Sequence, residues 1–380
     1  MTPVYLDYNA TAPIKPAVAS AIGRALEVTG NPSSVHSFGR AARKLVEDSR
    51  ETLAQIVRCK SSEIVFTASA TEANNLVLAG AGRHRLIVSA VEHPAVLKTA
   101  RAAGGEVVVL PVDANGVVEL AALEAALKEG GADALVSLML ANNETGAVQP
   151  VAEAAQLAHG RGALIHCDAV QGPGRLPVTL AELGVDYLSL SAHKFAGPKG
   201  AGALIARDGA PLKASVIGGG QERGRRAGTE NVAGIAGLAC AAELAADDLA
   251  NRDRLSGLRD ALESRVIEIE PRVHVFSARA ERLPNTSCLN MPGVQSETQV
   301  MALDLAGVAV SAGSACSSGK VEPSHVLRAT GVSDAISGCA IRVSLGWGTK
   351  PKDVDAFIEA WRALYAGLTN RFRSGISGAR

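Results

Sequence analysis

Short apolar runs alternate with longer helical stretches from about residue 63 to residue 249 of this 380-residue chain. Several of the runs are nearly all apolar, as strands covered on both faces of a sheet are. The helical stretches between them end in glycine, which is a common helix stop signal. This alternation is typical of a mostly parallel α/β sheet. The seven runs are EIVFT, RLIVSA, EVVVLPV, ALVSLML, ALIHC, DYLSLS and GALIA.

Polar residues cluster directly after several of these runs. The clusters are ASATEANN, VEHPAV, ANNETG, CDAVQG and SAHK. In open parallel sheets, ligands bind beyond the carboxyl ends of the strands, where the loops after different strands meet. We therefore expect these five clusters to converge on one ligand site.

Composition argues against several classes of protein. The chain is 47% hydrophobic and carries 38 basic and 38 acidic residues, so nothing favours binding to nucleic acid. No apolar run approaches the roughly 20 residues that span a bilayer, and the first residues do not resemble a signal peptide. Six cysteines occur singly, without a C-x-x-C pair, as is usual for free thiols in a reducing compartment. We expect a cytoplasmic protein.

The pattern changes in the last third of the chain. Strands are expected near TSCLNM, VAVS and AIRVSL, and helices near residues 296–305 and 354–368. These predict a smaller α+β domain made of residues 1–14 and 256–380, beside a large domain of residues 15–255. Before it, the glycine- and arginine-rich stretch GGGQERGRRAGTEN has no periodicity, and loops of this length in compact domains usually have a function.

Lys194 follows an apolar run, in SAHKFAGPKG. A lone lysine at a strand end is more often a solvated surface residue, but a desolvated amine can condense with a carbonyl group. A helix expected to begin near Glu72 would offer main-chain N–H groups to an anion, joined by Thr71, Ser191 and His193. An ordinary helix cap is the alternative for this segment. A Schiff-base lysine beside a phosphate site indicates pyridoxal phosphate.

That cofactor needs a carboxylate at its pyridine nitrogen, and Asp168 at the end of ALIHCD is the candidate. Gln171 could donate to the ring oxygen, and His93 could stack on the ring or move protons. Without the lysine, Asp168 would be a turn residue and His93 a loop histidine. A metal site at residues 166–168 is disfavoured, because adjacent strand residues point to opposite faces, and Cys167 is expected to fill the core.

Two further residues stand out by their surroundings. Arg342 lies in the apolar run AIRVSL and needs an anionic partner, either a substrate carboxylate or a structural ion pair. Cys316 lies among small residues in SAGSACSSGK, which favours a thiol that can move and react, although free cysteines are mostly buried and inert.

With these residues assembled, the chain closely resembles the cysteine desulfurases of the NifS/IscS type, a branch of the fold-type-I pyridoxal-phosphate enzymes. The resemblance covers nearly the whole chain except its tail, and the wording of some motifs leans toward the nitrogen-fixation branch. Asn74 stands where aspartate is common. The motifs are YLDYNAT, GNPSSVHSFG, IVFTASATEANN, VEHPAV, NNETG, DAVQ, SAHKFAGPKG, GGGQERGRRAGTENV, SAGSACSSG, EPSHVLRA and IRVSLG.

The resemblance implies fold type I, with a mostly parallel seven-stranded sheet between helices, and it implies a role for each site residue. Lys194 would carry pyridoxal 5'-phosphate, and His93 would stack over its ring. Thr229 would reach the phosphate from the neighbouring subunit, so a homodimer is expected. The remaining cofactor contacts would be Ala70, Thr71, Ser191 and His193 at the phosphate, and Asn143, Asp168 and Gln171 at the ring.

For the reaction, the resemblance implies that sulfur is removed from L-cysteine to give L-alanine and a persulfide on Cys316. Asn143 and Arg342 would contact the substrate, Arg342 through its carboxylate. The sulfur would go to an iron–sulfur scaffold protein, and Cys316 is the candidate ligand of a transient cluster shared with that scaffold. Alternatives are a selenocysteine lyase or an aminotransferase on the same fold, or a non-catalytic binding protein.

Overall fold

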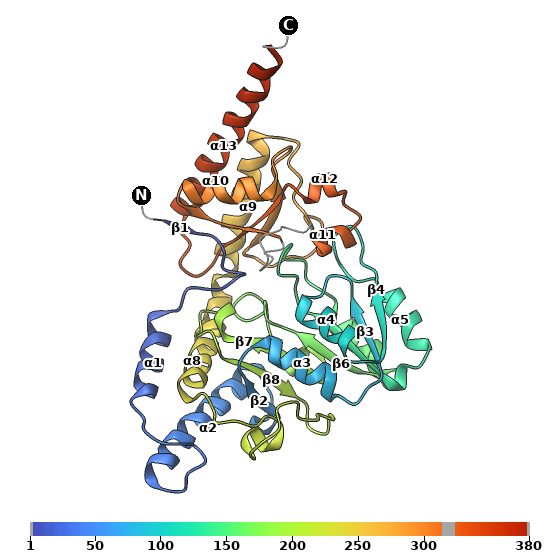
Figure 1. Ribbon diagram of the computed structural model, residues 1–380, viewed down its shortest axis with the longest axis vertical. Coiled ribbons are helices and arrows are strands. Elements are labelled where there is room, and N and C mark those ends of the chain that lie inside the picture. Colours follow the sequence, from blue (N-terminus) through green and yellow to red (C-terminus); the bar gives the residue numbers. More distant parts are fainter. Residues whose placement is uncertain (1–2, 314–323, 378–380) are drawn as a thin grey trace.

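The computed structural model describes residues 3–313 and 324–377, with side chains to residue 367. A seven-stranded sheet lies at the centre of the larger lobe (Figure 1). Only β8 runs antiparallel to its neighbours in this sheet, and all other pairs are parallel, so the predicted mostly parallel α/β fold is confirmed. In sheet order the strands are β2 (Ile64–Thr67), β8 (Gly202–Ala206), β7 (Tyr187–Ser191), β6 (Leu164–Asp168), β5 (Ala134–Met139), β3 (Arg85–Ser89) and β4 (Glu106–Leu110).

Helices cover both faces of the sheet, which is why its strands are apolar on both sides. In β5, Val136 and Leu138 face one apolar layer and Leu135 faces the other. Residues of α3 (Ala70–Gly80) and α4 (Pro94–Ala102) complete the layer around Leu135. The opposite layer includes residues of α1 (Pro16–Leu26), α2 (Ser37–Val57), α5 (Leu120–Lys128), α6 (Val151–His159), α7 (Leu180–Leu183) and α8 (Val232–Asp248).

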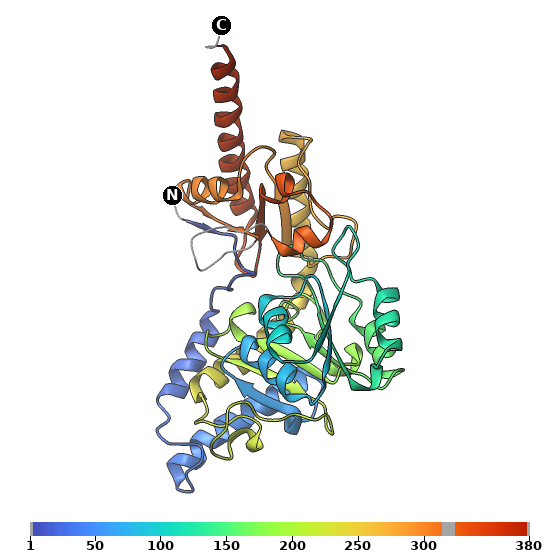
Figure 2. The same cartoon turned by 45° about the vertical axis from the view of Figure 1, so that its right-hand side comes forward.

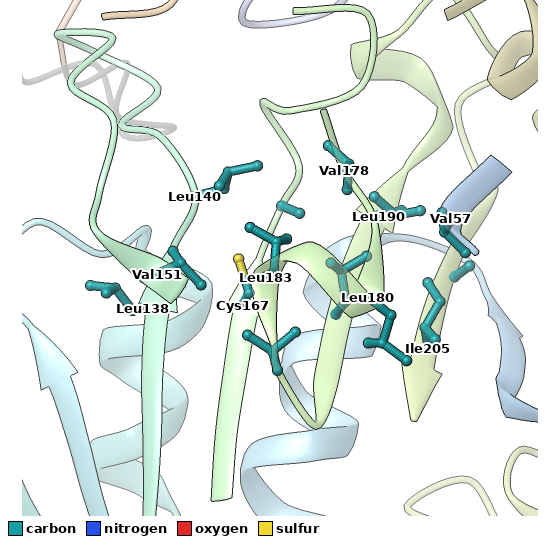
Figure 3. Close-up of a cluster of buried hydrophobic side chains, with 14 of the residues drawn as sticks. Val57, Leu138, Leu140, Val151, Cys167, Val178, Leu180, Leu183, Leu190 and Ile205 are labelled. Atoms are coloured by element: carbon teal, nitrogen blue, oxygen red, sulfur yellow. The ribbon is translucent and has the colours of Figure 1, made fainter. Parts of the chain in front are cut away.

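Cys167 belongs to this second layer. Its side chain lies among aliphatic residues that include Leu138 and Leu190 (Figure 3), and it is fully buried. Burial raises the pKa of its thiol well above the ordinary value, which keeps the sulfur protonated and unreactive. The expectation that this cysteine fills the core is confirmed.

The smaller lobe has its own core around Leu6, Phe357 and Trp361. Its sheets are a parallel pair, β1-β10, and an antiparallel sheet in the order β11-β12-β9. Figures 1 and 2 show the last helix, α13, extending beyond this lobe. The elements are β1 (Val4–Tyr5), α9 (Arg252–Ile269), β9 (Thr286–Asn290), α10 (Ser296–Leu305), β10 (Val308–Ala309), β11 (Ser311–Ala312), α11 (His325–Ala329), α12 (Asp334–Ser337), β12 (Ala340–Ser344) and α13 (Pro351–Ser377).

The N-terminal segment lies against this smaller lobe. Val4 pairs with Val308 in parallel, and Asp7 forms a bridge with Ser344. The first residues of the chain therefore pack with its last third, although the domain limits expected from the sequence stay a prediction. No helix within the described ranges is long and apolar enough to cross a membrane.

Three elements differ from expectation. The helix expected near Glu72 begins two residues earlier, at Ala70, because the Ser69 hydroxyl accepts a hydrogen bond from the Glu72 N–H at 3.2 Å and caps the helix. The VAVS run is two strands, β10 and β11, since the chain changes pairing partner from β1 to β12 at Val310. The last helix is longer than residues 354–368 and runs from Pro351 to Ser377.

A buried ion pair holds the glycine- and arginine-rich loop on the sheet. Arg50 of α2 donates to both carboxylate oxygens of Glu222 at 2.8 Å, and Glu222 also accepts from the Phe66 N–H of β2 at 2.9 Å. Both charged side chains are buried. The pair therefore connects α2, β2 and the loop at one point.

Replacing one partner of this pair should destabilise the protein strongly. We expect Glu222→Ala to lower the free energy of unfolding by about 3–5 kcal/mol, because it leaves the Arg50 guanidinium buried with only the exposed Glu47 as an ionic partner. Guanidinium chloride unfolding followed by circular dichroism measures the change. The exposed Lys44–Asp48 pair supplies the control, Asp48→Ala, which should cost about 0.3–0.5 kcal/mol. Equal losses in the two variants would contradict this account of the loop.

Candidate functional site

One cavity of about 450 Å³ lies at the carboxyl ends of the sheet strands, between the two lobes. The loops after β2, β3, β5, β6 and β7 all reach it, so the five polar clusters converge as expected. Residues of the smaller lobe close it from the other side, among them His325 and Arg342. The sequence-predicted site residues that line it are Ala70, Thr71, His93, Asn143, Asp168, Gln171, Ser191, His193, Lys194 and Arg342.

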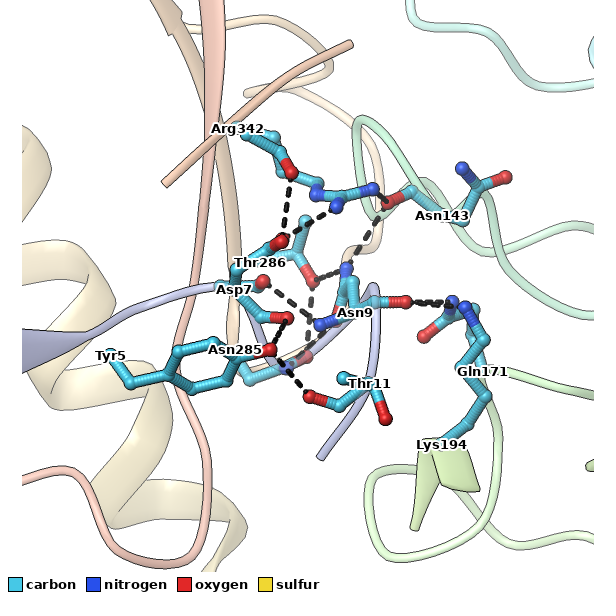
Figure 4. A network of polar contacts seen from close by, with 12 residues as sticks. Tyr5, Asp7, Asn9, Thr11, Asn143, Gln171, Lys194, Asn285, Thr286 and Arg342 are labelled. Atoms are coloured by element: carbon cyan, nitrogen blue, oxygen red, sulfur yellow. Dashed lines mark hydrogen bonds and ion pairs between the residues drawn. The ribbon is translucent and has the colours of Figure 1, made fainter. Parts of the chain in front are cut away.

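Lys194 ends a 3₁₀ turn that directly follows β7, and its amine points into the cavity wall rather than into solvent. The amine donates to the main-chain oxygen of Asn9 at 2.7 Å (Figure 4). Its pKa is lowered to about 8, mainly by burial and further by the charges of Arg342 and Arg175. A substantial fraction of the amine is therefore neutral, and nucleophilic, slightly above neutral pH.

Asp168 is the last residue of β6 and is buried. One carboxylate oxygen accepts from the side-chain amide of Asn74 at 2.7 Å, and the other accepts from the Val170 N–H at 3.1 Å. Both oxygens of this carboxyl group therefore have a donor. The amide oxygen of Asn74 has no partner among the described residues.

The N-terminus of α3 forms a cradle for an anion at one end of the cavity. Ser69 caps the helix, so the main-chain N–H groups of the first turn around Ala70 and Thr71 face outward from its end. The main chain at the start of β8 lies close to this helix end, because β8 begins with a glycine. An added Cβ at Gly202 would lie 2.8 Å from the main chain of Ser69. Ser191 lies next to this helix end in the cavity lining.

Two histidines of the cavity are uncharged at neutral pH. Burial and the neighbouring Lys194 lower the pKa of His193 to about 4. Burial also lowers the pKa of His93, whose Nδ1 accepts from the Ala95 N–H at 3.1 Å and caps α4. This bond assigns the proton of the neutral ring to Nε2 of His93. Pro94 at the first helical position fixes the turn that presents the ring.

The sequence left open whether Arg342, in β12, binds a substrate carboxylate or forms a structural ion pair. The structure contains such an ion pair. Nη2 of Arg342 lies 2.7 Å from an oxygen of Asp7, and Nη1 donates to the Asn143 oxygen at 3.0 Å (Figure 4). Ser311 donates to the second oxygen of Asp7 at 2.9 Å. The Nε–H of Arg342 has no partner among the described residues, so the guanidinium keeps donor capacity for a further anion.

Asn9 is a site residue that sequence reasoning missed. Its main-chain oxygen accepts from Lys194, and from the Gln171 amide at 3.2 Å. Its side-chain amide donates to Thr286 at 2.8 Å and to the Asn143 oxygen at 3.2 Å. The signal was present in the YLDYNAT motif. There the two polar residues Asp7 and Asn9 follow the end of a strand and are separated by one residue.

Two buried carboxyl groups beside the cavity were also missed. Glu92 accepts from the Ser89 hydroxyl at 2.7 Å and from the Met139 N–H at 2.8 Å, and burial raises its pKa to about 8. Glu144 accepts from the Ser324 hydroxyl at 2.5 Å, and burial raises its pKa to about 7. Both carboxyls are thus largely protonated below neutral pH.

Two predicted residues are not in this group. Thr229 is exposed and lines a separate cavity of about 160 Å³ together with Thr67 and Arg226. Cys316 lies outside the described residues, between Gly313, which lines the main cavity, and Ser324.

The family model that matches this chain is described as aminotransferase class-V and covers residues 4–357. A cysteine desulfurase of Cereibacter sphaeroides is 45% identical over 94% of this chain and 95% of its own length. A cysteine desulfurase IscS of Dictyoglomus turgidum is 44% identical over 96% of this chain and 95% of its own length.

A solved structure described as a NifS-like protein superposes with a TM-score of 0.90 at 36% identity, covering 96% of this chain and all of the other. Matches of this identity and coverage define a family and not only a fold. The chain belongs to the class-V aminotransferases and, within them, to the cysteine desulfurases of the NifS/IscS type.

Glu92 should make stability depend on pH in a specific direction. Its raised pKa means that the folded protein binds a proton that the unfolded chain releases near its ordinary pKa of 4.5. This contribution is fully present below pH 4.5 and is lost as pH rises through about 8. Glu92→Gln keeps the acceptor for Ser89 and Met139 but cannot ionise. It should gain stability over the parent as pH rises, by up to about 1.4 kcal/mol per pH unit.

Urea unfolding at pH 5, 6.5 and 8 measures this difference. The exposed Glu153→Gln in α6 is the matched control and should show a constant difference from the parent. A pH-independent difference for Glu92→Gln would show that the carboxyl does not change its protonation in this range.

Proposed function

We propose that this protein uses pyridoxal 5'-phosphate to remove sulfur from L-cysteine, giving L-alanine and a persulfide on Cys316. The observation that carries the proposal is that one cavity is lined by Lys194, Asp168 and the N-terminus of α3. The relatives from Cereibacter sphaeroides and Dictyoglomus turgidum, both named cysteine desulfurases, support the substrate.

The residues of the cavity fit this cofactor. The helix end with Ala70 and Thr71 suits a phosphate, with Ser191 and His193 as further donors beside it. When bound, pyridoxal phosphate supplies an aldehyde that condenses with amines and a protonated ring that withdraws electrons from the substrate Cα. A cavity of about 450 Å³ lies within the usual range for small-molecule sites.

Lys194 is the group that joins the cofactor and later moves the proton. The lowered pKa of its amine makes the neutral form accessible near pH 8, and only the neutral amine can attack a carbonyl or accept the Cα proton. Its neighbour Asn9 offers only an oxygen, which accepts a hydrogen bond and leaves the lone pair of the neutral amine free.

Asp168, Gln171 and His93 tune the ring. Asp168, held by Asn74 and the Val170 N–H, keeps the proton on the ring nitrogen by its negative charge. The Gln171 amide donates to the ring oxygen. His93 would stack over the ring and, with a proton at Nε2, would relay protons between substrate and solvent.

Arg342 and Asn143 orient the substrate. The spare Nε–H of Arg342 and the second hydrogens of its terminal nitrogens bind the substrate carboxylate, while Asp7 and the Asn143 oxygen hold the guanidinium plane. A carboxylate fixed there and an amine fixed at Lys194 position the Cα between them.

Cys316 takes the sulfur. Its thiolate attacks the sulfur of the substrate, so a sulfur–sulfur bond forms and the Cβ–sulfur bond breaks with its electron pair left on carbon. That carbon takes up a proton and becomes the methyl group of alanine. The thiol of Cys316 and L-cysteine thus give a persulfide and L-alanine, without another oxidant or reductant.

A homodimer completes the site. Thr229 lies on the exposed glycine- and arginine-rich loop, away from the cavity of its own chain, and would reach the phosphate bound by the partner. Ile217, directly before this loop, is 86% exposed, which is unfavourable for a large apolar side chain unless a partner covers it.

The fate of the sulfur follows from the family. We propose that an iron–sulfur scaffold protein accepts the sulfur in the cytoplasm and that Cys316 ligates a cluster transiently during transfer. The residues of the sequence motifs favour nitrogen fixation as the pathway. A thiolate is the usual protein ligand of such clusters.

The reaction is tested with L-cysteine, a reductant and the purified holoenzyme. We expect equal amounts of alanine and sulfide. Cys316→Ala should abolish both products and persulfide labelling while the absorbance of the bound cofactor stays, and Lys194→Ala should lose that absorbance. Cys59→Ala is the matched control, since burial raises the pKa of that thiol to about 12 and it should turn over normally. Pyruvate in place of alanine would indicate an aminotransferase, and faster turnover of selenocysteine a selenocysteine lyase.

The subunit contribution is tested by two variants. We expect Ile217→Asp to sediment as a monomer, because a charge cannot be buried in an apolar interface. Thr229→Ala should remain a dimer but weaken cofactor binding about tenfold or more, the effect of losing one hydrogen bond to a charged group. Sedimentation velocity and cofactor titration measure the two effects. Unchanged cofactor affinity in Thr229→Ala would remove this residue from the phosphate site.

A further inference from the structure

Arg175 is a buried cation that the reaction described above does not use. It follows β6 in the loop before α7 and is only 6% exposed. Its guanidinium forms no ion pair with any carboxylate of the described residues, and Asp248, the acidic group that acts on it, is bonded to Lys15 at 2.7 Å. A buried arginine without an anion is costly, so its hydrogen bonds need a reason.

Within the described part of the chain, the hydrogen bonds of its guanidinium go to Gln171 and Lys194, two residues of the proposed cofactor site. Nη1 donates to the side-chain oxygen of Gln171 and, at 3.2 Å, to its main-chain oxygen. Nη2 donates to the main-chain oxygen of Lys194 at 3.1 Å. One side chain therefore holds both residues from behind the cavity.

The contact with Gln171 decides which way its amide faces. A guanidinium has only donors, so the group of Gln171 next to Arg175 must be the oxygen. The amide nitrogen then points the other way, toward the Asn9 oxygen and the cavity. Without Arg175, only the 3.2 Å bond to the Asn9 oxygen would favour this orientation, and an amide turned over would present an oxygen that repels an oxygen of the occupant.

The contact with Lys194 fixes the main chain from which the amine projects. The bond reaches the carbonyl at the end of the 3₁₀ turn after β7, just before Ala196, which has a positive φ of 66°. The charge of Arg175 also lowers the pKa of the Lys194 amine, after burial and Arg342. Both effects favour a neutral amine held in one place.

We propose that Arg175 is a positioning residue that locks the Gln171 amide with its N–H groups toward the cavity and holds the Lys194 main chain beside it. The identity of the occupant rests on the proposed function, but the two contacts do not. Arg175 acts through its neighbours and touches neither cofactor nor substrate.

A double-mutant cycle on cofactor affinity separates this role from general stability. In the parent, Arg175→Met should weaken binding of pyridoxal phosphate about tenfold to a hundredfold, as loss of charged hydrogen bonds does. In a Gln171→Ala background the same change should cost clearly less than in the parent, because only the contact with the Lys194 main chain is left to lose. Equal losses in both backgrounds would overturn the proposal.

Two further variants serve as a control and as a substitute for Arg175→Met. Arg254→Met is the matched control, since Arg254 also donates to main-chain oxygens, those of Thr349 and Trp347, but forms no hydrogen bond with Gln171 or Lys194 among the described residues, and the variant should bind cofactor as the parent does. If Arg175→Met fails to fold, Arg175→Lys retains the charge and a single donor nitrogen and should show a smaller loss that is again reduced in the Gln171→Ala background.

A measurement without cofactor distinguishes failure of this inference from failure of the proposed function. The rate at which trinitrobenzenesulfonate modifies Lys194 in the apoprotein, followed by peptide mapping between pH 6.5 and 9.5, reports the neutral amine. Arg175→Met should shift the midpoint of this profile to higher pH. If the parent binds no pyridoxal phosphate, the proposed function fails, and an unshifted profile would overturn the role of Arg175 by itself.

Discussion

Positive charge buried around one cavity is the constraint on which the rest of this structure depends. Lys194, Arg175 and Arg342 all lose most of their contact with water, and each lowers the stability of the charged form of its neighbours. Ion pairing offsets the cost of burying these charges only in part. Asp7 forms an ion pair with Arg342, but no carboxylate among the described residues pairs directly with Arg175. Such a cavity is prepared for a ligand that brings negative charge of its own.

The acidic residues nearby divide into two kinds. Asp7 and Asp168 have N–H or O–H donors on both oxygens, which stabilise a carboxylate. Glu92 and Glu144 are fully enclosed, and burial raises their pKa values to about 8 and about 7. Neutral carboxyls do not cancel the cations, so the burial of these two groups preserves the positive potential of the site. The environment of each acid, more than its residue type, sets its charge.

Much of the fold could be predicted from the sequence because its signals are local. Strands buried on both faces are apolar throughout, and the polar residues that follow them meet at one edge of a parallel sheet. The positions of His93, Asp168 and Lys194 in one cavity follow from that rule alone. The early start of α3 was missed because Ser69, a single capping side chain, outweighed the pattern of the residues after it.

What could not be predicted lies in contacts between distant parts of the chain. The bond between Lys194 and Asn9 joins residues 185 positions apart, and Asn9 lies 277 positions from Thr286. No periodicity encodes such pairs. Arg175 was also missed, because a single arginine in a loop reads as a solvated residue until its burial is known. Thr229 and Cys316 stay predictions.

These long-range contacts give the N-terminal segment a mechanical role between the lobes. Asp7 binds the guanidinium of Arg342 in the smaller lobe. Two residues later, the main-chain oxygen of Asn9 accepts a hydrogen bond from the amine of Lys194 in the larger lobe. The Ala12 N–H then bonds the His193 oxygen at 2.8 Å. The proposed carboxylate-binding group and the proposed base are thus tied to one short segment of the chain. A movement of one lobe against the other must stretch or break these bonds, so the segment itself sets the separation between the two groups that hold the substrate.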